Sequence, residues 1–404
     1  MTNDTVPAPM RATRRAGGWQ AALLLAGSCM PVMGSVLITP ILPQLSQKFG
    51  DQPGGEILVP MIVAIPALMI AIFAPFAGQI VDRLGRKTLL IITMFAYALV
   101  GTAPAWLESL PLILFSRVLV GVCEAAIMTV CTTLIVDYFH DERRRNRYLG
   151  LQVVATTLAA TVFIALGGAL GVSGWHTPFW IYALSIVIAV PMIFSLWEPS
   201  KQDATDSHVQ ASGKVRTPWR RIWVPVIVSI FGGFSFYIIA LEVGYLVVGT
   251  GVAATNSGVI GAVAAAASLA AAIGGISFMR IGKLPTGIQL PIAFGLQAIG
   301  MVIIWFVPGT AGIVVGAVIA GLGGGLLLPS LLTWLVSRTG FEERGRVTGW
   351  FTSAFFFGQF LTPILAAALT QIARTLPAAI GVVGVLAAVV AIATGVALRA
   401  RSPR

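Results

Sequence analysis

Three charged side chains lie deep inside long segments that are otherwise apolar: Arg117, Glu124 and Glu242. If these segments cross a bilayer, each charge costs on the order of 3 kcal/mol, so such a residue usually marks a functional site. Arg117 and Glu124 share one face of a helix, at an axial distance of ~10 Å. A carboxyl group at that depth is suited to binding and releasing a proton near neutral pH, and we predict a proton-coupling site at Glu124 and Arg117. The simpler alternative is a neutral Glu124 that makes a hydrogen bond between packed helices.

Aromatic residues surround Glu242 in the sequence. A carboxylate among aromatic rings suits a hydrophobic cation, which it attracts through charge and cation-π contact. The alternative is that Glu242 reaches the outer membrane interface and that the aromatic residues face lipid or neighbouring helices. The predicted substrate cavity comprises Glu242, Tyr237, Phe234, Met33 and Phe356.

The composition places these residues in a membrane protein. Of the 404 residues, 57% are hydrophobic and 10% are charged, and the mean hydropathy is +0.90. Soluble domains carry about 25% charged residues. A helix that spans a bilayer needs roughly 20 apolar residues. Twelve windows meet this requirement: 19–42, 57–80, 88–107, 112–137, 148–171, 177–197, 222–248, 255–279, 286–307, 311–336, 347–370 and 376–398.

The net charge of +11 reflects membrane topology rather than binding to nucleic acid. When the amino terminus is placed in the cytoplasm, nearly all of the 26 lysines and arginines fall in cytoplasmic segments. The exceptions are Lys48, Arg117 and Arg374. This asymmetry is typical of positive-inside insertion. We therefore expect a multi-pass protein of the inner (plasma) membrane with both termini in the cytoplasm.

A polar stretch at 198–221 separates six apolar windows from six. The loops "GQIVDRLGRK" and "RRRNRYLG" of the first half have weaker copies, "GISFMRIGKL" and "EERGRVTG", at nearly the same spacing in the second half. Such a pattern indicates a duplicated six-helix unit, which is one known transporter architecture. The expected parts are a cytoplasmic tail (1–18), an N-terminal six-helix bundle (19–197), a cytoplasmic linker (198–221), a C-terminal six-helix bundle (222–398) and a cytoplasmic tail (399–404).

The loop "GQIVDRLGRK" at 78–87 resembles the signature of the major facilitator superfamily, G-x-x-x-D-R-x-G-R-K/R. "RVLVGVCEAA" supplies the Arg and Gly of a second family element in the fourth helix, and "GQFLTPIL" in the eleventh window is a third similarity. The chain most resembles the drug/proton antiporter branch. The resemblance implies an all-α membrane protein whose two pseudo-symmetric six-helix bundles rock around a central site.

In that family picture the loop at 78–87 forms a cytoplasmic gate. Its basic residues would pair with the other bundle, closing the cytoplasmic side in one state and releasing it in the other. The alternative is that the charges only determine topology, although acidic residues contribute little to topology and the loop contains one. The predicted gate comprises Gly78, Asp82, Arg83, Gly85, Arg86 and Lys87.

The sequence departs from the antiporter pattern in the fifth window. Phe163 and Ile164 stand where drug/proton antiporters usually carry a Gly-Pro pair, although Gly167 and Gly168 are kept. The direction of transport is therefore open. Export by antiport is favoured by two embedded carboxylates against one arginine, and uptake of a small organic acid or nutrient by symport would use Arg117 as an anion site.

Other functions have little support in the sequence. No GxxxxGK[ST] phosphate loop occurs, which argues against an ATP-driven pump, and the three histidines fall in three separate loops. A membrane receptor or enzyme would need an appended domain or a catalytic cluster. We predict a monomeric secondary transporter, with no enzyme activity, cofactor or metal, that couples protons to a small organic solute and most readily exports a hydrophobic or cationic compound.

Overall fold

The computed structural model describes residues 16–76, 85–199, 219–340 and 343–399, and every regular element in them is a helix. Twelve helical segments are long and apolar enough to cross a membrane, so the predicted number is confirmed. The first half contains α1 (Gly18–Val36), η1 (Thr39–Ile41), α2 (Leu42–Phe49), α3 (Gly55–Phe73), α5 (Arg86–Thr102), η2 (Ala103–Ala105), α6 (Leu110–Tyr138), α7 (Glu142–Gly171), η3 (Thr177–Ala183) and α8 (Leu184–Ser195). The second half contains α10 (Trp219–Gly249), α11 (Ser257–Ile281), α12 (Thr286–Phe306), α13 (Thr310–Val336), α14 (Arg344–Ala373) and α15 (Leu376–Arg399).

Two helix boundaries differ from the expected windows for local reasons. The first spanning segment continues to Phe49, and a 3-10 turn with Pro40 at its start joins its two helices, because proline cannot supply the helical N–H bond. The fifth begins at Glu142 rather than 148, because the Asp141 carboxylate accepts a hydrogen bond of 2.8 Å from the Arg144 N–H and caps the helix.

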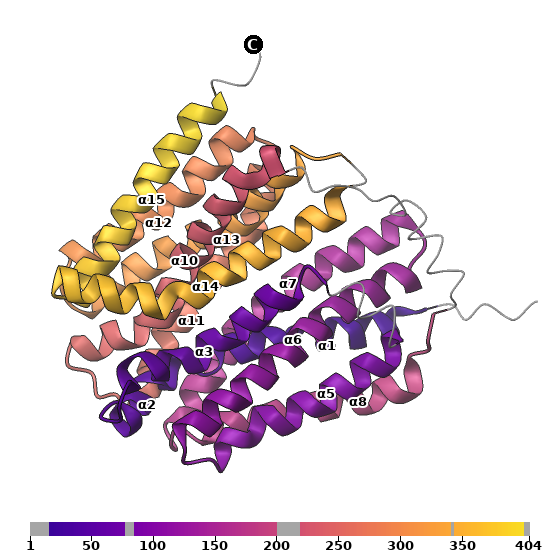
Figure 1. Ribbon diagram of the computed structural model, residues 1–404, viewed down its shortest axis with the longest axis horizontal. Coiled ribbons are helices and arrows are strands. Elements are labelled where there is room, and N and C mark those ends of the chain that lie inside the picture. The colour runs from indigo at the N-terminus through magenta and orange to yellow at the C-terminus, as the bar shows by residue number, and fades with distance from the viewer. Residues whose placement is uncertain (1–15, 77–84, 200–218, 341–342, 400–404) are drawn as a thin grey trace, which may run out of the picture.

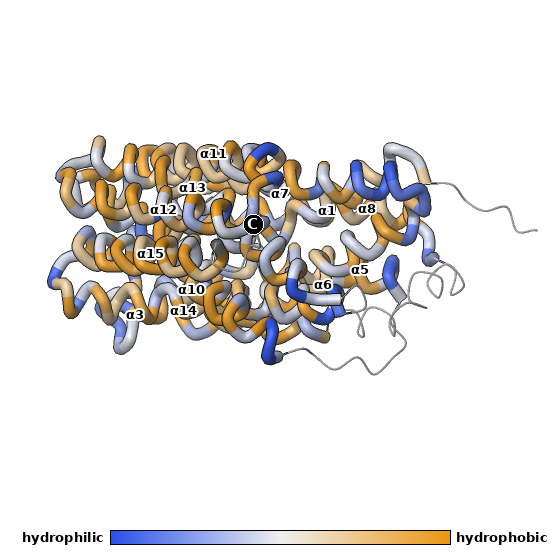
Figure 2. Tube along the Cα trace, turned by 90° about the horizontal axis from the view of Figure 1, so that it is seen from above, coloured by the Kyte–Doolittle hydropathy of each residue, from blue (hydrophilic) through white to orange (hydrophobic). Residues whose placement is uncertain are grey.

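The helices of each half pack mainly on one another. Figure 1 shows the first half, indigo to magenta, on one side of the molecule and the second half, orange to yellow, on the other. Between the halves, α11 lies along α7 and α14 lies along α3. Figure 2 shows hydrophobic residues along the length of the helices and most hydrophilic ones near their ends. Large apolar side chains such as Phe194, Ile372 and Leu99 are exposed on the outside, where they suit a lipid environment.

One glycine in each half allows the same close contact between two helices. A Cβ on Gly121 of α6 would lie 2.6 Å from the Pro66 Cα of α3, and one on Gly321 of α13 would lie 2.4 Å from the Ala267 oxygen of α11. In each half the fourth spanning helix therefore approaches the second closely at an equivalent place. This agreement supports the duplication inferred from the loops.

Contacts between the halves occur near the ends predicted to face outward. A Cβ on Gly168 of α7 would lie only 2.7 Å from the Gly261 Cα of α11, and the Ser257 hydroxyl donates to the Gly168 oxygen at 2.9 Å. Ser46 of α2 and Tyr245 of α10 share a hydrogen bond of 2.8 Å. These contacts hold the outer ends of the two halves together. On the opposite side, the Ser353 hydroxyl of α14 donates to the Ala71 oxygen of α3 at 2.6 Å.

Candidate functional site

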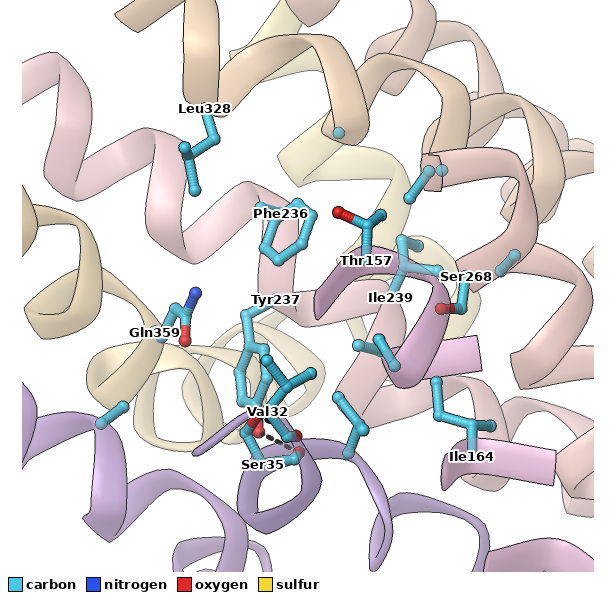
Figure 3. A pocket seen from close by; sticks show the side chains of 18 of the residues that line it. Val32, Ser35, Thr157, Ile164, Phe236, Tyr237, Ile239, Ser268, Leu328 and Gln359 are labelled. Atoms are coloured by element: carbon cyan, nitrogen blue, oxygen red, sulfur yellow. Dashed lines mark hydrogen bonds between the residues drawn. The ribbon is translucent and has the colours of Figure 1, made fainter. Parts of the chain in front are cut away.

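A cavity of about 310 Å³ lies between the two halves, at the middle of the helices. It is bordered by eight helices: α1, α3, α6 and α7 from the first half and α10, α11, α13 and α14 from the second. Figure 3 shows the side chains of several lining residues converging on it from both halves. This arrangement provides a solute site that both halves share.

Most of the cavity wall is apolar. The polar residues of the lining are a minority: Ser35, Thr156, Thr157, Ser235, Tyr237, Ser268, Gln359 and Glu124. Glu124 is the only ionisable carboxyl group in the lining, and neither lysine nor arginine belongs to it among the residues described. The wall therefore suits a largely apolar molecule with a few hydrogen-bonding groups, and disfavours a fixed negative charge.

The predicted cavity residues divide into two groups. Tyr237 and Phe356 line the cavity. Met33 and Phe234 do not, because they turn toward the helix faces that pack in the cores of their own halves. Glu242 is 7% exposed and is also absent from the described lining, although Ile239 and Val243 beside it belong to it. On a helix, neighbouring positions point about 100° apart, and this separates Phe234 and Glu242 from the lining residues.

Glu124 is fully buried and lies against α1. A Cβ on Gly34 of α1 would be 1.7 Å from Glu124 Oε1, so the carboxyl group occupies space that only glycine leaves free. The Tyr97 hydroxyl of α5 lies 3.4 Å from the same oxygen, and the second oxygen, Oε2, has no hydrogen-bond partner among the described residues. A buried polar atom without a partner is uncommon in folded proteins, so this oxygen is a candidate for a functional role.

Arg117 is also fully buried, but its donors are satisfied inside the first half. Its guanidinium donates to the Tyr182 hydroxyl at 3.0 Å and to the carbonyl oxygens of Val100 and Gly101 at 3.2 and 2.9 Å. It also lies 5.3 Å from the centre of the Phe179 ring. These neutral groups surround the guanidinium, and none of its hydrogen bonds goes to a carboxylate among the described residues. Arg117 does not border the central cavity.

The described part of the predicted gate lies at the start of α5. Gly85 has a φ of +81°, which favours glycine, and it is followed at once by the helix. Arg86 pairs with Asp137 at the end of α6. The Glu198 carboxylate accepts hydrogen bonds from the backbone N–H groups of Arg86 and Lys87 at 2.5 and 2.9 Å, which satisfies the first donors of the helix.

Lys87 has its partners close to its own bundle in this conformation. Its ammonium group donates to the Ile193 oxygen of α8 at 2.7 Å, and Glu198, which binds its backbone N–H, is the first residue of the predicted linker. In this conformation Lys87 therefore binds within its own bundle instead of bridging to the other, because the ends of α8 and α5 meet here. The remaining predicted gate residues, Gly78, Asp82 and Arg83, lie outside the described residues.

Two tyrosines of the site, Tyr97 and Tyr182, were not predicted from the sequence. Tyr97 donates to the Met30 oxygen of α1 at 2.6 Å as well as approaching Glu124, and Tyr182 accepts from Arg117 and lies 3.5 Å from the Gly34 oxygen. A hydroxyl group inside an apolar window was the available signal. Among the residues that the structure describes, no three His, Cys, Asp or Glu side chains gather closely enough to hold a metal ion.

A comparison of the sequence with models of protein families identifies a family that has this architecture. The family model of the Major Facilitator Superfamily matches residues 23–312 and 254–404, which together cover most of the chain. The chain belongs to the major facilitator superfamily. It has the fold of a multi-pass membrane protein with two pseudo-symmetric six-helix halves, as the resemblance of its loop signature implied.

Curated relatives of this superfamily member include drug-resistance proteins. It is 28% identical to the class H tetracycline resistance protein of Pasteurella multocida, over 45% of this chain and 45% of that protein. The chain spans about half the length of this relative, and about half the length of two further relatives that are tetracycline and multidrug resistance proteins. It is 22% identical to the quinolone resistance protein NorA of Staphylococcus aureus, over 84% of this chain and 87% of that protein.

A solved structure supports the superfamily fold. The D-xylose-proton symporter matches 94% of this chain and 97% of its own, with a TM-score of 0.74 and 13% identity. At that identity the likeness concerns the fold alone. Proton coupling is typical of the family, and its members are transporters rather than enzymes.

Proposed function

We propose that this transporter exports a small, largely apolar or cationic solute in exchange for protons. The observation that carries the proposal is Glu124: a fully buried carboxyl group in the wall of the cavity between the halves, with one oxygen that has no hydrogen-bond partner among the described residues. To couple protons to a solute, a carboxyl group must border the path that the solute takes. Burial between two helices also limits the other groups with which the Glu124 carboxyl group can bond.

The chemistry of the cavity supports a solute without a fixed negative charge. Aromatic and aliphatic groups, including Phe236 and Phe356, make up most of the wall, and Glu124 is its ionisable group. An ionised Glu124 would attract a cation, whereas a protonated one would not. Competition between a proton and a cationic solute for one carboxyl group is a simple basis for exchange.

The relatives add support of a different kind. The curated relatives named for resistance to tetracycline and quinolones are related to this chain at 22% to 28% identity. We extend an export role from them to this chain as part of the proposal. We also propose that the transporter acts as a monomer, and that both termini, with the linker at 198–221, face the cytoplasm.

Uptake of an organic acid is the alternative, and it would need a cation that faces the solute. Arg117 was the candidate for that anion site. Its donors are directed to Tyr182 and to two carbonyl oxygens instead, and it lies outside the cavity lining. This arrangement favours a positioning role for Arg117 beside the proton site.

The test uses the purified protein in proteoliposomes with an imposed pH gradient and two lipophilic cations, ethidium and tetraphenylphosphonium, as probes. We expect cation accumulation against the proton flow, and we expect Glu124→Gln to abolish its dependence on the gradient. Glutamine keeps the size of the side chain but cannot bind or release a proton.

The matched control is Glu142→Gln, which removes an exposed carboxyl group at the start of α7. It should transport like the wild type. Accumulation of the cation in the same direction as the proton flow would contradict export in exchange for protons. Gradient-driven transport by Glu124→Gln would contradict the assignment of the proton site.

A further inference from the structure

Tyrosine hydroxyl groups from both halves of the molecule bind the C-terminal part of α1. Tyr97, in the first half, donates to the Met30 oxygen at 2.6 Å. Tyr237, in the second half, donates to the Ser35 oxygen at 3.0 Å, as the dashed line in Figure 3 marks. The segment from Met30 to Ser35 thus connects the proton site to the partner bundle.

This part of α1 is suited to deformation. Pro31 lies inside the helix and lacks an N–H group, so one helical hydrogen bond is absent and a local bend is favoured. Gly34 follows one turn later and carries no side chain between the helix and Glu124. A small change in the hydrogen bonds of this segment can therefore change its path.

The Tyr97 hydroxyl has one proton to donate and two acceptors within reach. It lies 2.6 Å from the Met30 oxygen and 3.4 Å from Glu124 Oε1, so the bond to α1 is the stronger one here. A protonated carboxyl group can itself donate, whereas an ionised one only accepts. Hydrogen bonds to an ionised acceptor are shorter and about twice as strong as neutral ones.

From this geometry we propose that Tyr97 is a positioning residue that couples proton binding at Glu124 to the contact between the two halves. While Glu124 is protonated, Tyr97 donates to Met30 and holds α1 in place. When Glu124 loses its proton to the cavity, the Tyr97 O–H turns to the carboxylate and releases the Met30 oxygen. The segment around Pro31 then relaxes, and the Ser35 contact with Tyr237 weakens.

The other groups that face Glu124 leave this role to Tyr97. Those within electrostatic range are Arg117 and Cys123 of α6, Tyr182 of η3 and Tyr237 of α10. Arg117 carries a fixed charge, but its donors are directed to Tyr182 and to carbonyl oxygens. Tyr97 is the hydroxyl within hydrogen-bond distance of Glu124 among the described residues.

The proposal rests on the proposed function, since it takes Glu124 as the proton site, and the test separates the two. Spin labels at Ser173→Cys and Thr255→Cys, exposed positions beside the outer contact of α7 and α11, would report the distance between the halves. The labels are placed in a background in which Cys29, Cys123 and Cys131 are replaced by alanine, and the full chain is reconstituted in lipid nanodiscs. Distances are measured from mildly acidic to mildly alkaline pH.

In the parent protein we expect longer distances to gain population as the pH rises. Tyr97→Phe keeps the ring but removes the donor, so it should lose this pH dependence, as Glu124→Gln should. Tyr148→Phe is the matched control, because the Tyr148 hydroxyl makes no hydrogen bond among the described residues, and it should keep the parent profile.

Each contrary outcome has a distinct meaning. If Glu124→Gln loses the pH dependence and Tyr97→Phe retains the parent profile, the role of Tyr97 is overturned while the proton site stands. If the parent protein shows no pH-dependent change, or Glu124→Gln retains it, the proposed proton site itself fails. A thermal unfolding temperature near that of the parent excludes misfolding of Tyr97→Phe as the cause.

Discussion

At the scale of single residues, the site depends on the absence of a side chain at Gly34. The carboxyl group of Glu124 lies where a Cβ would be, and the Tyr97 hydroxyl lies 3.2 Å from that same point. Glycine here has no turn to make, since it lies inside α1, and its role is to leave space. The carboxyl group can therefore be fully buried beside a helix and still border the cavity.

Gly34→Ala should displace Glu124 and disturb the proton site. Inserting a methyl group into a packed region typically destabilises a protein by about 1–3 kcal/mol, and here the displaced group is the proposed proton acceptor. We expect a lower unfolding temperature in detergent and a loss of gradient-driven transport. Gly18→Ala in the same helix is the control, because a Cβ there meets nothing within 4 Å. Equal stability and transport in both variants would show that Gly34 has no spatial role.

Residue-level contacts also explain the described part of the loop signature. Gly85 adopts a positive φ, and Glu198, which lies 111 residues after Lys87, caps the helix that starts there. A sequence pattern alone could not pair these groups, because the contact depends on how the sixth spanning segment ends. Arg86 and Lys87, the described basic residues of the signature, thus have structural partners of their own.

At the scale of helices, α7 and α11 meet near the ends that are predicted to face outward, and we expect this contact to keep that side closed. Gly168 and Gly261 allow the two backbones to meet, and Ser257 adds a hydrogen bond across the contact. The sequence lacks the Gly-Pro pair of antiporters in this helix but keeps Gly167 and Gly168. The structure gives Gly168 a clear role: it permits the close approach of the two halves.

Gly168→Val should separate the outer ends, because its side chain would meet the backbone of Gly261, which cannot move aside as a flexible side chain could. We expect a larger fraction of molecules with the outer side open, measured as faster labelling of a cysteine introduced at Ser257. Gly150→Val, also in α7, is the control, since a Cβ at Gly150 has no neighbour within 4 Å. Unchanged labelling in Gly168→Val would contradict a role of this contact in closure.

At the scale of the whole molecule, the number of helices and the family could be predicted from the sequence, while the composition of the site could be predicted only in part. A bilayer requires long apolar segments, so twelve windows indicated twelve helices. The side-chain contacts depend on the rotation of each helix. Phe234 and Phe236 are close in the sequence, yet only Phe236 lines the cavity. For the same reason, Tyr97 could not be assigned to the site from the sequence.

The two halves meet around a cavity in which Glu124 is the only carboxyl group among the described lining residues, and this is the central feature of the proposed exchange. The most direct test is proton movement driven by the solute itself. Proteoliposomes with a trapped pH indicator, and with no initial pH gradient, receive ethidium or tetraphenylphosphonium on one side. We predict that protons leave the compartment that the cation enters, and that this movement is absent in Glu124→Gln. Protons that move in the same direction as the cation, or an unchanged signal in Glu124→Gln, would contradict the account.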